Sequence, residues 1–363
     1  MKILIFNWRD ITHPQAGGAE KYLHEIGKRL ADKHEVTLFC SHYPGAPTRE
    51  EIDGIEIVRS GGRFTTYMHA AVKYLAKLRR RDYDVIVDDI NGVPFFTPLY
   101  SRKPIVAIIH HIVGWNIFRR ELPLPLAIVG YLCERSIPYI YRNCKFVTVS
   151  ESTKEELKKF GIRECNITVI PNGIDLNPHL GKKYERPRIV YFGRIKNYKR
   201  IDHVLKAFRI VMREIPDAEL VIAGRGEATN LKNLAKNLNI DRSVMFMGEV
   251  NEKQKIEILS SSWVYVITST KEGWGISVIE ANACGTPAVA YDVPGLRDSV
   301  KHGYNGLLVE NGNIEALANT IINLIKNDSL RKELSKNAVE WAKQFSWDRS
   351  AEMFERVIKN AIE

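Results

Sequence analysis

Thr270-Lys-Glu-Gly-Trp-Gly-Ile-Ser-Val-Ile-Glu-Ala-Asn-Ala-Cys-Gly-Thr-Pro287 is the stretch that decides the fold. A strand is predicted just before it, at 264–268, and a helix within it, at 276–284. Gly273 and Gly275 form a loop in which the backbone can approach a ligand closely. Because the unpaired N–H groups at the start of a helix bind anions, this strand, loop and helix predict a diphosphate site.

Two carboxylates of this stretch are candidate ligands for a sugar nucleotide. Glu280 is the only charge on an otherwise apolar helix, where a lone carboxylate is costly unless it is paired. A ribose offers two adjacent hydroxyls, and a carboxylate can accept both. Glu272 precedes the glycine loop and is expected near the phosphate end, where a sugar ring lies. Two surface carboxylates are the alternative, which the helix and the loop glycines disfavour.

The same alternation of strand and helix continues through the 363 residues. Strands are also predicted at 2–7, 36–40, 55–59, 85–87, 105–109, 146–149, 189–192, 220–223, 244–247 and 288–291. Helices are predicted at 18–33, 64–81 and 153–160, and 313–363 is nearly all helix. Short strands with consecutive apolar residues are typical of parallel sheets buried on both faces. An α/β fold with two Rossmann-like, doubly wound domains facing a central cleft is therefore predicted.

The polar stretch 176–188, rich in proline and glycine, is the predicted linker. It separates an N-terminal domain of residues 1–178 from a C-terminal domain of residues 179–346. Ligands of such sheets bind beyond the carboxyl ends of the strands, so the loops there are expected to hold the chemistry.

A basic loop follows the strand predicted at 189–192. Arg194 and Lys199 stand in this loop, where fixed cations would stabilise the negative charge of a departing nucleoside diphosphate without a metal. Lys196 and Arg200 compete for the same role, and a solvated basic loop is the alternative.

Two loops of the N-terminal half carry further candidates. Gly17 and Gly18 follow the first strand and would let that loop come near the phosphates, although the sequence is not G-x-G-x-x-G. His110 and His111 follow the strand at 105–109, where a histidine could hydrogen-bond a sugar hydroxyl or orient the acceptor. A structural histidine is the alternative, and His110 is favoured over His111.

Glu272 and Glu280, with the residues between them, resemble the EX7E signature of the retaining glycosyltransferase family 4. Other landmarks of that family are matched, in its order, at 17–20, 149–152, 170–175, 192–194, 223–226 and 305–309. The resemblance implies a GT-B fold, with the acceptor on the N-terminal domain and the sugar donor on the C-terminal one. It also implies that the final helix, within 347–363, crosses back onto the N-terminal domain.

By this resemblance, Glu280 binds the ribose, Glu272 the donor sugar, and Arg194 and Lys199 the diphosphate. The implied catalytic residues are His110, Arg194, Lys199 and Glu272. The implied donor-binding residues are Gly17, Gly18, Gly193, Arg194, Lys199, Gly224, Glu272, Gly273, Trp274, Gly275, Ile276, Ser277 and Glu280. The family needs no metal or other cofactor, and Asp88-Asp89 is the one stretch weighed against that expectation.

Three positions depart from the family pattern. Arg200 stands where glycine usually follows the lysine, Asp298 where glutamate is usual, and Trp274 where phenylalanine is common. These differences concern details of donor binding rather than the reaction.

The net charge of +10 indicates an anionic partner. No nucleic-acid-binding motif is apparent, so phosphates and a membrane surface are expected ahead of DNA or RNA. Residues 64–81 read as an amphipathic helix with a basic end, and apolar, aromatic and basic side chains gather at 115–124. A lipid-linked acceptor is one expectation, with His111, Trp115 and Arg119 as acceptor-binding residues; a solvated helix and a loop packed in its own domain are the alternative.

The five cysteines are scattered and read as reduced thiols, and no signal peptide or membrane span is apparent. A cytoplasmic protein, peripheral at the inner face of the membrane, is expected. The predicted function is retaining transfer of a hexose from a UDP- or GDP-linked donor to a hydroxyl of a sugar or lipid-linked acceptor. Three alternatives stay open: an epimerase or phosphorylase of the same fold, a non-catalytic sugar-nucleotide-binding protein, and a nicotinamide oxidoreductase, which the missing G-x-G-x-x-G disfavours.

Overall fold

The computed structural model describes residues 1–175 and 180–363. Two compact units divide the chain. Unit 1 comprises Met1–Gly173 and Trp347–Glu363, and unit 2 comprises Ile174–Ser346. The boundary predicted between residues 178 and 179 lies outside the described residues, and each unit is considered by itself.

Unit 1 is built on an eight-stranded sheet in the order β3-β4-β2-β1-β5-β6-β7-β8. The strands are β1 (Lys2–Phe6), β2 (Glu35–Cys40), β3 (Arg49–Ile52), β4 (Ile55–Arg59), β5 (Val85–Asp89), β6 (Ile105–Ile109), β7 (Lys145–Thr148) and β8 (Ile167–Val169). Every pair is parallel except β3 with β4. Strand β3 was not predicted, because its charged residues 49–51 show no apolar pattern and it pairs only at the sheet edge.

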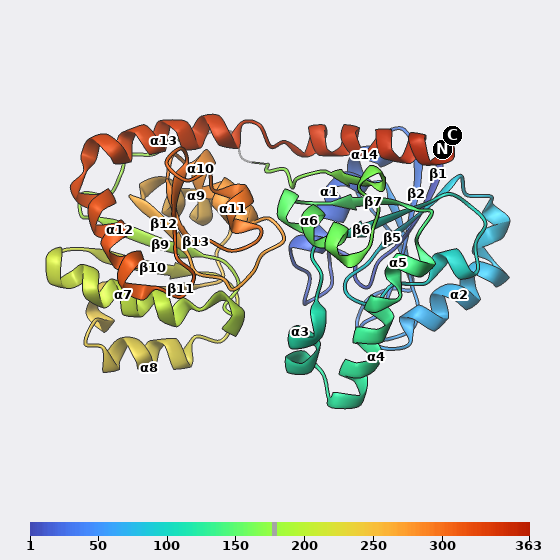
Figure 1. The fold of residues 1–363 in the computed structure, drawn as a ribbon, viewed down its shortest axis with the longest axis horizontal. Helices are drawn as coiled ribbons and strands as arrows, with labels where there is room; N and C mark the ends of the chain where they lie inside the picture. Colours follow the sequence, from blue (N-terminus) through green and yellow to red (C-terminus); the bar gives the residue numbers. More distant parts are fainter. Residues whose placement is uncertain (176–179) are drawn as a thin grey trace. The chain divides into compact units, whose positions relative to one another are not determined.

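The helices of unit 1 are α1 (Gly18–Ala31), α2 (Thr66–Ala76), α3 (Gly114–Glu121), α4 (Leu124–Arg135), α5 (Ile137–Ile140), α6 (Glu151–Phe160) and α14 (Trp347–Ile362). Helix α14 packs beside α1 (Figure 1). The Arg29 guanidinium donates to Asp348, and His34 Nε2 lies 3.2 Å from Glu355 Oε1. The prediction that the final helix belongs with the N-terminal domain is thereby confirmed.

Local signals set the helix ends. Ser150 Oγ accepts the Thr153 N–H over 3.2 Å at the start of α6, and Gly161 ends that helix with φ 107°. The amphipathic segment predicted as one helix over 64–81 is shorter, since α2 ends at Ala76 and a 3₁₀ turn covers Leu78–Arg81. None of the helices in the described part of the chain is long and apolar enough to cross a bilayer.

Unit 2 is built on a wholly parallel six-stranded sheet in the order β11-β10-β9-β12-β13-β14. The strands are β9 (Arg188–Phe192), β10 (Glu219–Ala223), β11 (Val244–Gly248), β12 (Val264–Ile267), β13 (Ala288–Tyr291) and β14 (Gly306–Val309). The helices are α7 (Ile201–Glu214), α8 (Thr229–Asn237), α9 (Glu252–Ser261), α10 (Ile276–Ala283), α11 (Leu296–Ser299), α12 (Ile314–Lys326) and α13 (Asp328–Ala342). Two doubly wound, Rossmann-like units confirm the predicted fold class.

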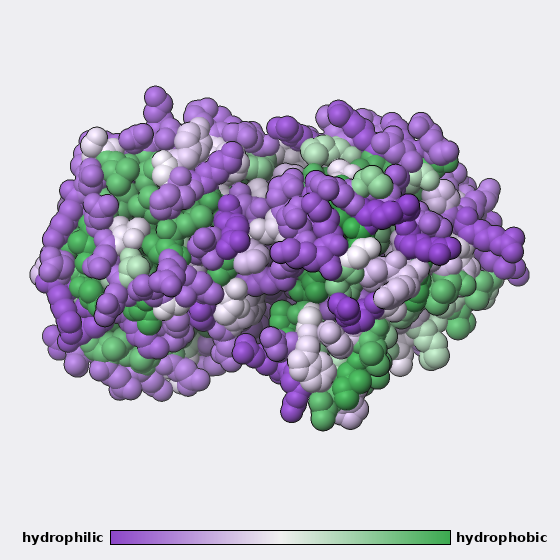
Figure 2. Space-filling model, in the orientation of Figure 1, coloured by the Kyte–Doolittle hydropathy of each residue, from purple (hydrophilic) through white to green (hydrophobic). Residues whose placement is uncertain are grey.

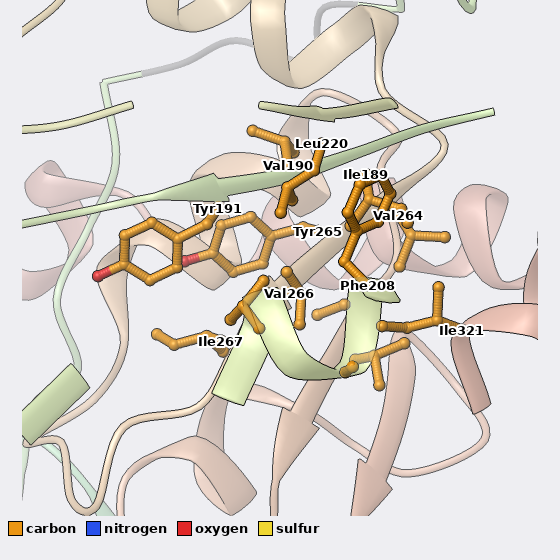
Figure 3. Packing of buried hydrophobic residues seen from close by; sticks show 14 of the residues in the cluster. Ile189, Val190, Tyr191, Phe208, Leu220, Val264, Tyr265, Val266, Ile267 and Ile321 are labelled. Carbon is orange, nitrogen blue, oxygen red and sulfur yellow. The ribbon is translucent and has the colours of Figure 1, made fainter. Parts of the chain in front are cut away.

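Two buried tyrosines connect the core of unit 2 to its loops. In Figure 3 the rings of Tyr191 and Tyr265 lie together, with their hydroxyls pointing away from the aliphatic side chains. The Tyr191 hydroxyl donates to the Arg194 carbonyl over 3.0 Å, and that of Tyr265 donates to the Phe192 carbonyl over 3.1 Å. Because buried hydroxyls need such partners, the core holds the loop after β9 in place.

Candidate active site

The strand order of unit 2 reverses between β9 and β12, and this is where doubly wound sheets bind ligands. The loop after β9 carries Arg194 and Lys199, and the loop after β12 carries Glu272. The predicted donor residues of the C-terminal half therefore meet at the switch point of one sheet.

Lys199 and Glu272 form a direct ion pair across these two loops. The Lys199 ammonium contacts Glu272 Oε1, and the Ser269 hydroxyl donates to the same oxygen over 2.5 Å. Burial lowers the pKa of Lys199, but the Glu272 carboxylate outweighs it and the pKa is raised overall. Lys199 therefore stays cationic at neutral pH.

The other three cations of the loop lie differently. Arg194 and Lys196 are exposed, and Arg194 Nη2 lies 3.5 Å from the Tyr198 hydroxyl. Arg200 turns to the loop after β12, where its guanidinium donates to the Thr268 carbonyl over 3.0 Å. Its backbone has φ 47°, a left-handed conformation that favours glycine, which explains the usual glycine at this position. Arg200 is thus engaged in holding a loop.

Glu280 is paired, as a carboxylate on an otherwise apolar helix requires. It is 7% exposed on α10, and its Oε1 accepts a hydrogen bond from the Lys255 ammonium over 2.8 Å. Lys255 comes from α9 and was missed in the sequence. The available signal is its position one turn before Ile258 and Leu259, on the buried face of that helix.

The predicted glycines shape the loops by close approach. A Cβ on Gly224 would lie 2.0 Å from the Gly193 carbonyl oxygen, so the loops after β9 and β10 touch there. Gly275 caps α10 with φ 101°, which only glycine adopts readily. Gly273 precedes it in the same loop, directly before the helix N-terminus.

The remaining donor candidates flank the start of α10. Ser277, the second residue of α10 after Ile276, already pairs through its Oγ with the Tyr265 hydroxyl at 2.7 Å. The Trp274 ring is buried against Phe345, with ring centroids 5.1 Å apart. Trp274 therefore fills space inside unit 2.

Asp298 serves as a cap in place of the usual glutamate. Its Oδ2 accepts the Gly295 N–H over 3.1 Å, and a Cβ on Gly295 would lie 2.2 Å from the Glu272 carbonyl oxygen. The Glu272 N–H in turn donates to the Pro294 carbonyl over 3.1 Å. This second loop supports the backbone of Glu272.

In unit 1 the Gly17–Gly18 loop follows β1. Gly17 caps α1 in an extended conformation, and its N–H donates to Glu20 Oε2 over 2.7 Å. Upstream in the loop, Asp10 Oδ2 accepts from Arg59 Nε over 2.7 Å, and both side chains are fully buried. This ion pair fixes the loop and was not foreseen.

His110 lies at the end of β6 in unit 1, 7% exposed. Its Nε2 is 3.2 Å from Asp89 Oδ1, and its ring meets that of Tyr22 edge-on. His111 follows it, and Trp115 and Arg119 lie exposed on α3.

Asp88 belongs to the core of unit 1. It accepts hydrogen bonds from the Thr97 hydroxyl over 2.8 Å and the Tyr141 hydroxyl over 2.5 Å. Burial raises its pKa to about 6. Among the described residues, no group of three or more histidines, cysteines or acidic residues is arranged to hold a metal ion.

Comparisons with known proteins identify the class. The family "Glycosyl transferases group 1" matches residues 175–341, and "Glycosyltransferase Family 4" matches residues 16–178. The chain is 30% identical to N-acetyl-alpha-D-glucosaminyl L-malate synthase of Bacillus anthracis, over 96% of each chain. It is 32% identical to an uncharacterized glycosyltransferase of Methanocaldococcus jannaschii, over 61% of this chain and 62% of that protein.

Solved structures share the fold. Sucrose-phosphate synthase from Thermosynechococcus elongatus aligns with a TM-score of 0.80 and 20% identity, over 99% of this chain and 98% of that one. Anabaena HepE in complex with UDP-glucose aligns with a TM-score of 0.77 and 19% identity, over 99% and 100%. The fold and the family matches define a GT-B glycosyltransferase. The chain belongs to the glycosyltransferases of family 4 and group 1, as the resemblance predicted.

Proposed function

We propose that this glycosyltransferase moves a hexose, with retention of configuration, from a UDP- or GDP-linked donor to a hydroxyl acceptor. The observation that carries the proposal is the ion pair of Lys199 with Glu272 at the switch point of unit 2, with Arg194 in the same loop as Lys199 and Glu280 on the helix that follows Glu272. Two cations and a helix N-terminus suit a diphosphate, and two carboxylates suit the hydroxyls on either side of it.

In the proposed reaction, the diphosphate lies at the start of α10 and between Arg194 and Lys199. These cations stabilise the charge that develops as the glycosidic bond breaks, so the proposal needs no metal or other cofactor. Glu280 holds the ribose and Glu272 the sugar, while His110 is the proposed further contact to the sugar. The acceptor hydroxyl attacks the sugar from the same face from which the leaving group departs, and the leaving phosphate takes the proton of that hydroxyl.

The names of similar proteins support this donor and acceptor chemistry. The Anabaena protein was crystallised with UDP-glucose, and several relatives are named D-inositol 3-phosphate glycosyltransferase, for example that of Thermobispora bispora. The matched region spans about three fifths of the first relatives, so the identity of donor and acceptor is part of the proposal.

We further propose a lipid-linked or glycan acceptor and peripheral attachment to an anionic membrane at the cytoplasmic face. The outer side of α4 exposes large apolar side chains, of which Val129 is 55% and Leu132 60% exposed. Figure 2 shows apolar residues gathered over α4 and α2 of unit 1. Arg119 and Arg120 end the neighbouring α3 and are exposed. Apolar and basic side chains together suit the interface of an anionic bilayer, where His111, Trp115 and Arg119 are the proposed acceptor contacts.

The test incubates the protein with UDP- and GDP-linked hexoses and a panel of sugar, inositol and lipid-extract acceptors. We expect a new glycoside whose anomeric configuration, read by NMR, matches that of the donor, with unchanged yield in EDTA. An epimerase would change the donor without forming a glycoside, and a phosphorylase would require phosphate. A non-catalytic protein would bind a nucleoside diphosphate and yield no product, which would overturn the proposal.

A further inference from the structure

Lys255 is a buried cation that neither the sequence motifs nor the family landmarks single out. It is 4% exposed, on the face of α9 that also buries Ile258 and Leu259. A capping box fixes the start of this helix, in which the Asn251 side chain accepts the Gln254 N–H over 2.9 Å and the Gln254 side chain accepts the Asn251 N–H over 3.0 Å. The position of Lys255 is therefore set by the helix itself.

The ammonium of Lys255 connects three elements around the donor site. It donates to Glu280 Oε1 over 2.8 Å, lies 2.7 Å from Glu252 Oε2, and is 5.8 Å from the centre of the Phe192 ring at the end of β9. Burial lowers the pKa of Lys255, but Glu280 and Glu252 outweigh it and the pKa is raised overall. The cation is thus retained opposite the carboxylate assigned to the ribose.

The two partners of Lys255 differ in exposure. The Glu280 side chain is 9% exposed, whereas that of Glu252 is 73% exposed. An exposed pair contributes little, because water screens it. A buried ion pair adds little folding stability compared with two apolar side chains of the same volume, so stability alone does not explain why Lys255 and Glu280 are paired here. What the buried pair does fix is the orientation of the Glu280 side chain.

The orientation matters because a carboxylate has two oxygens. Lys255 engages Oε1, and no donor from the described residues is hydrogen-bonded to Oε2. We propose that Lys255 is a positioning residue that turns Glu280 so that Oε2 accepts from the ribose hydroxyls, and that it thereby sets a preference for ribonucleotide over 2′-deoxyribonucleotide donors. This inference rests on the proposed donor site and names what tunes its selectivity.

The test compares UDP with 2′-deoxy-UDP, and GDP with 2′-deoxy-GDP, by calorimetry on the full chain. Inorganic pyrophosphate serves as a third probe, because it reports on the proposed diphosphate site, at Arg194, Lys199 and the start of α10, and lacks the ribose. For Lys255→Met we expect roughly tenfold weaker binding of the ribonucleotide, the size of one charge-assisted hydrogen bond. The 2′-deoxy form, which keeps its 3′-hydroxyl, should be weakened less, and pyrophosphate should be nearly unchanged. Lys255→Arg is expected to keep most of the selectivity, and Glu252→Gln all of it.

A double-variant cycle shows whether Lys255 acts through Glu280. In a Glu280→Gln background, Lys255→Met should have little further effect on the ratio of ribo to deoxy affinity. Lys255→Gln provides the same comparison if Lys255→Met does not fold.

Two results would overturn the inference. Equal weakening of all three probes by Lys255→Met would mark Lys255 as merely structural, and an unchanged ratio would leave Glu280 independent of it. A wild-type protein that binds neither nucleotide would instead overturn the proposed function, and this outcome is distinguishable because it appears before any substitution.

Discussion

The ammonium of Lys199 and the carboxylate of Glu272 are in contact, although they come from loops after two different strands, β9 and β12. The pair places the cation proposed to bind phosphate beside the carboxylate proposed to bind the sugar. The Glu272 carboxylate raises the pKa of Lys199, so the ion pair keeps this lysine charged.

Lys199→Met should lower kcat/KM for transfer by about 100-fold or more. Loss of one fixed group that stabilises the negative charge developing in a transition state typically has an effect of this size. Lys196→Met is the matched control: Lys196 is exposed in the same loop, and we expect activity close to wild type. Initial rates with a saturating acceptor give both values. If Lys196→Met were the more damaging variant, the assignment of the diphosphate cation would move to Lys196.

How much the sequence could predict depends on the kind of interaction. Buried parallel strands carry their own apolar signature, so both sheets and the loops at their carboxyl ends could be placed. The Lys255–Glu280 pair could not, because its members lie 25 residues apart on two helices. The left-handed backbone at Arg200, with φ 47°, was equally hidden, since the Arg200 carbonyl is held by the Thr268 hydroxyl, 68 residues further along the chain. Candidate site residues could be predicted where they follow directly after a strand. The side-chain pairs between elements that are distant in the sequence could not.

Removing one partner of the buried Asp10–Arg59 pair should destabilise unit 1 more than breaking an exposed pair. Arg59→Met leaves an unpaired buried carboxylate, and we expect a loss of about 3 kcal/mol in urea unfolding. Lys326→Met breaks the exposed Lys326–Glu214 pair, of 2.8 Å, and should leave the stability nearly unchanged because water screens this pair. Comparable losses in the two variants would contradict the burial argument.

Asp10 also predicts a dependence on pH. Burial raises its pKa, but Arg59 and Thr12 outweigh this and hold the pKa of Asp10 below its ordinary value. A depressed folded-state pKa stabilises the fold above the unfolded value of about 4, and this contribution is lost as the pH falls through the folded value. Asp10→Asn should therefore be less stable than wild type at pH 7, with the gap closing below about pH 4.

Asp88 predicts the opposite trend, because burial raises its pKa to about 6. Its stabilising contribution is complete below the unfolded value of about 4 and is lost as the pH rises through 6. Wild type should lose about 3 kcal/mol relative to Asp88→Asn between pH 4 and pH 7. Urea unfolding across this range measures the difference, and parallel curves for the two proteins would show that Asp88 does not titrate there.

Arg200 offers a test of backbone strain against side-chain contacts. Arg200→Ala loses the hydrogen bond to the Thr268 carbonyl and keeps the left-handed φ, whereas Arg200→Gly loses the same bond and relieves the strain. The glycine variant should therefore be about 1 kcal/mol more stable than the alanine variant. Thermal unfolding of both variants measures the difference in stability. Equal stability of the alanine and glycine variants would mean that this backbone is not strained.

The exposed apolar side of α4 predicts binding to anionic vesicles. Ile128 and Leu132 lie one helical turn apart and are 43% and 60% exposed, so Ile128→Ser with Leu132→Ser removes apolar surface without opening the core. We expect wild type to float with vesicles that contain phosphatidylglycerol, to stay behind with phosphatidylcholine alone, and to be released by high salt. The double variant should lose most of this binding.

Met245→Ser with Met247→Ser is the matched control, because these side chains are exposed on unit 2 and carry no role in the proposal. Equal loss of binding in both double variants would indicate nonspecific hydrophobic adsorption rather than a membrane-binding face. Equal flotation with anionic and neutral vesicles would refute the role of the basic residues.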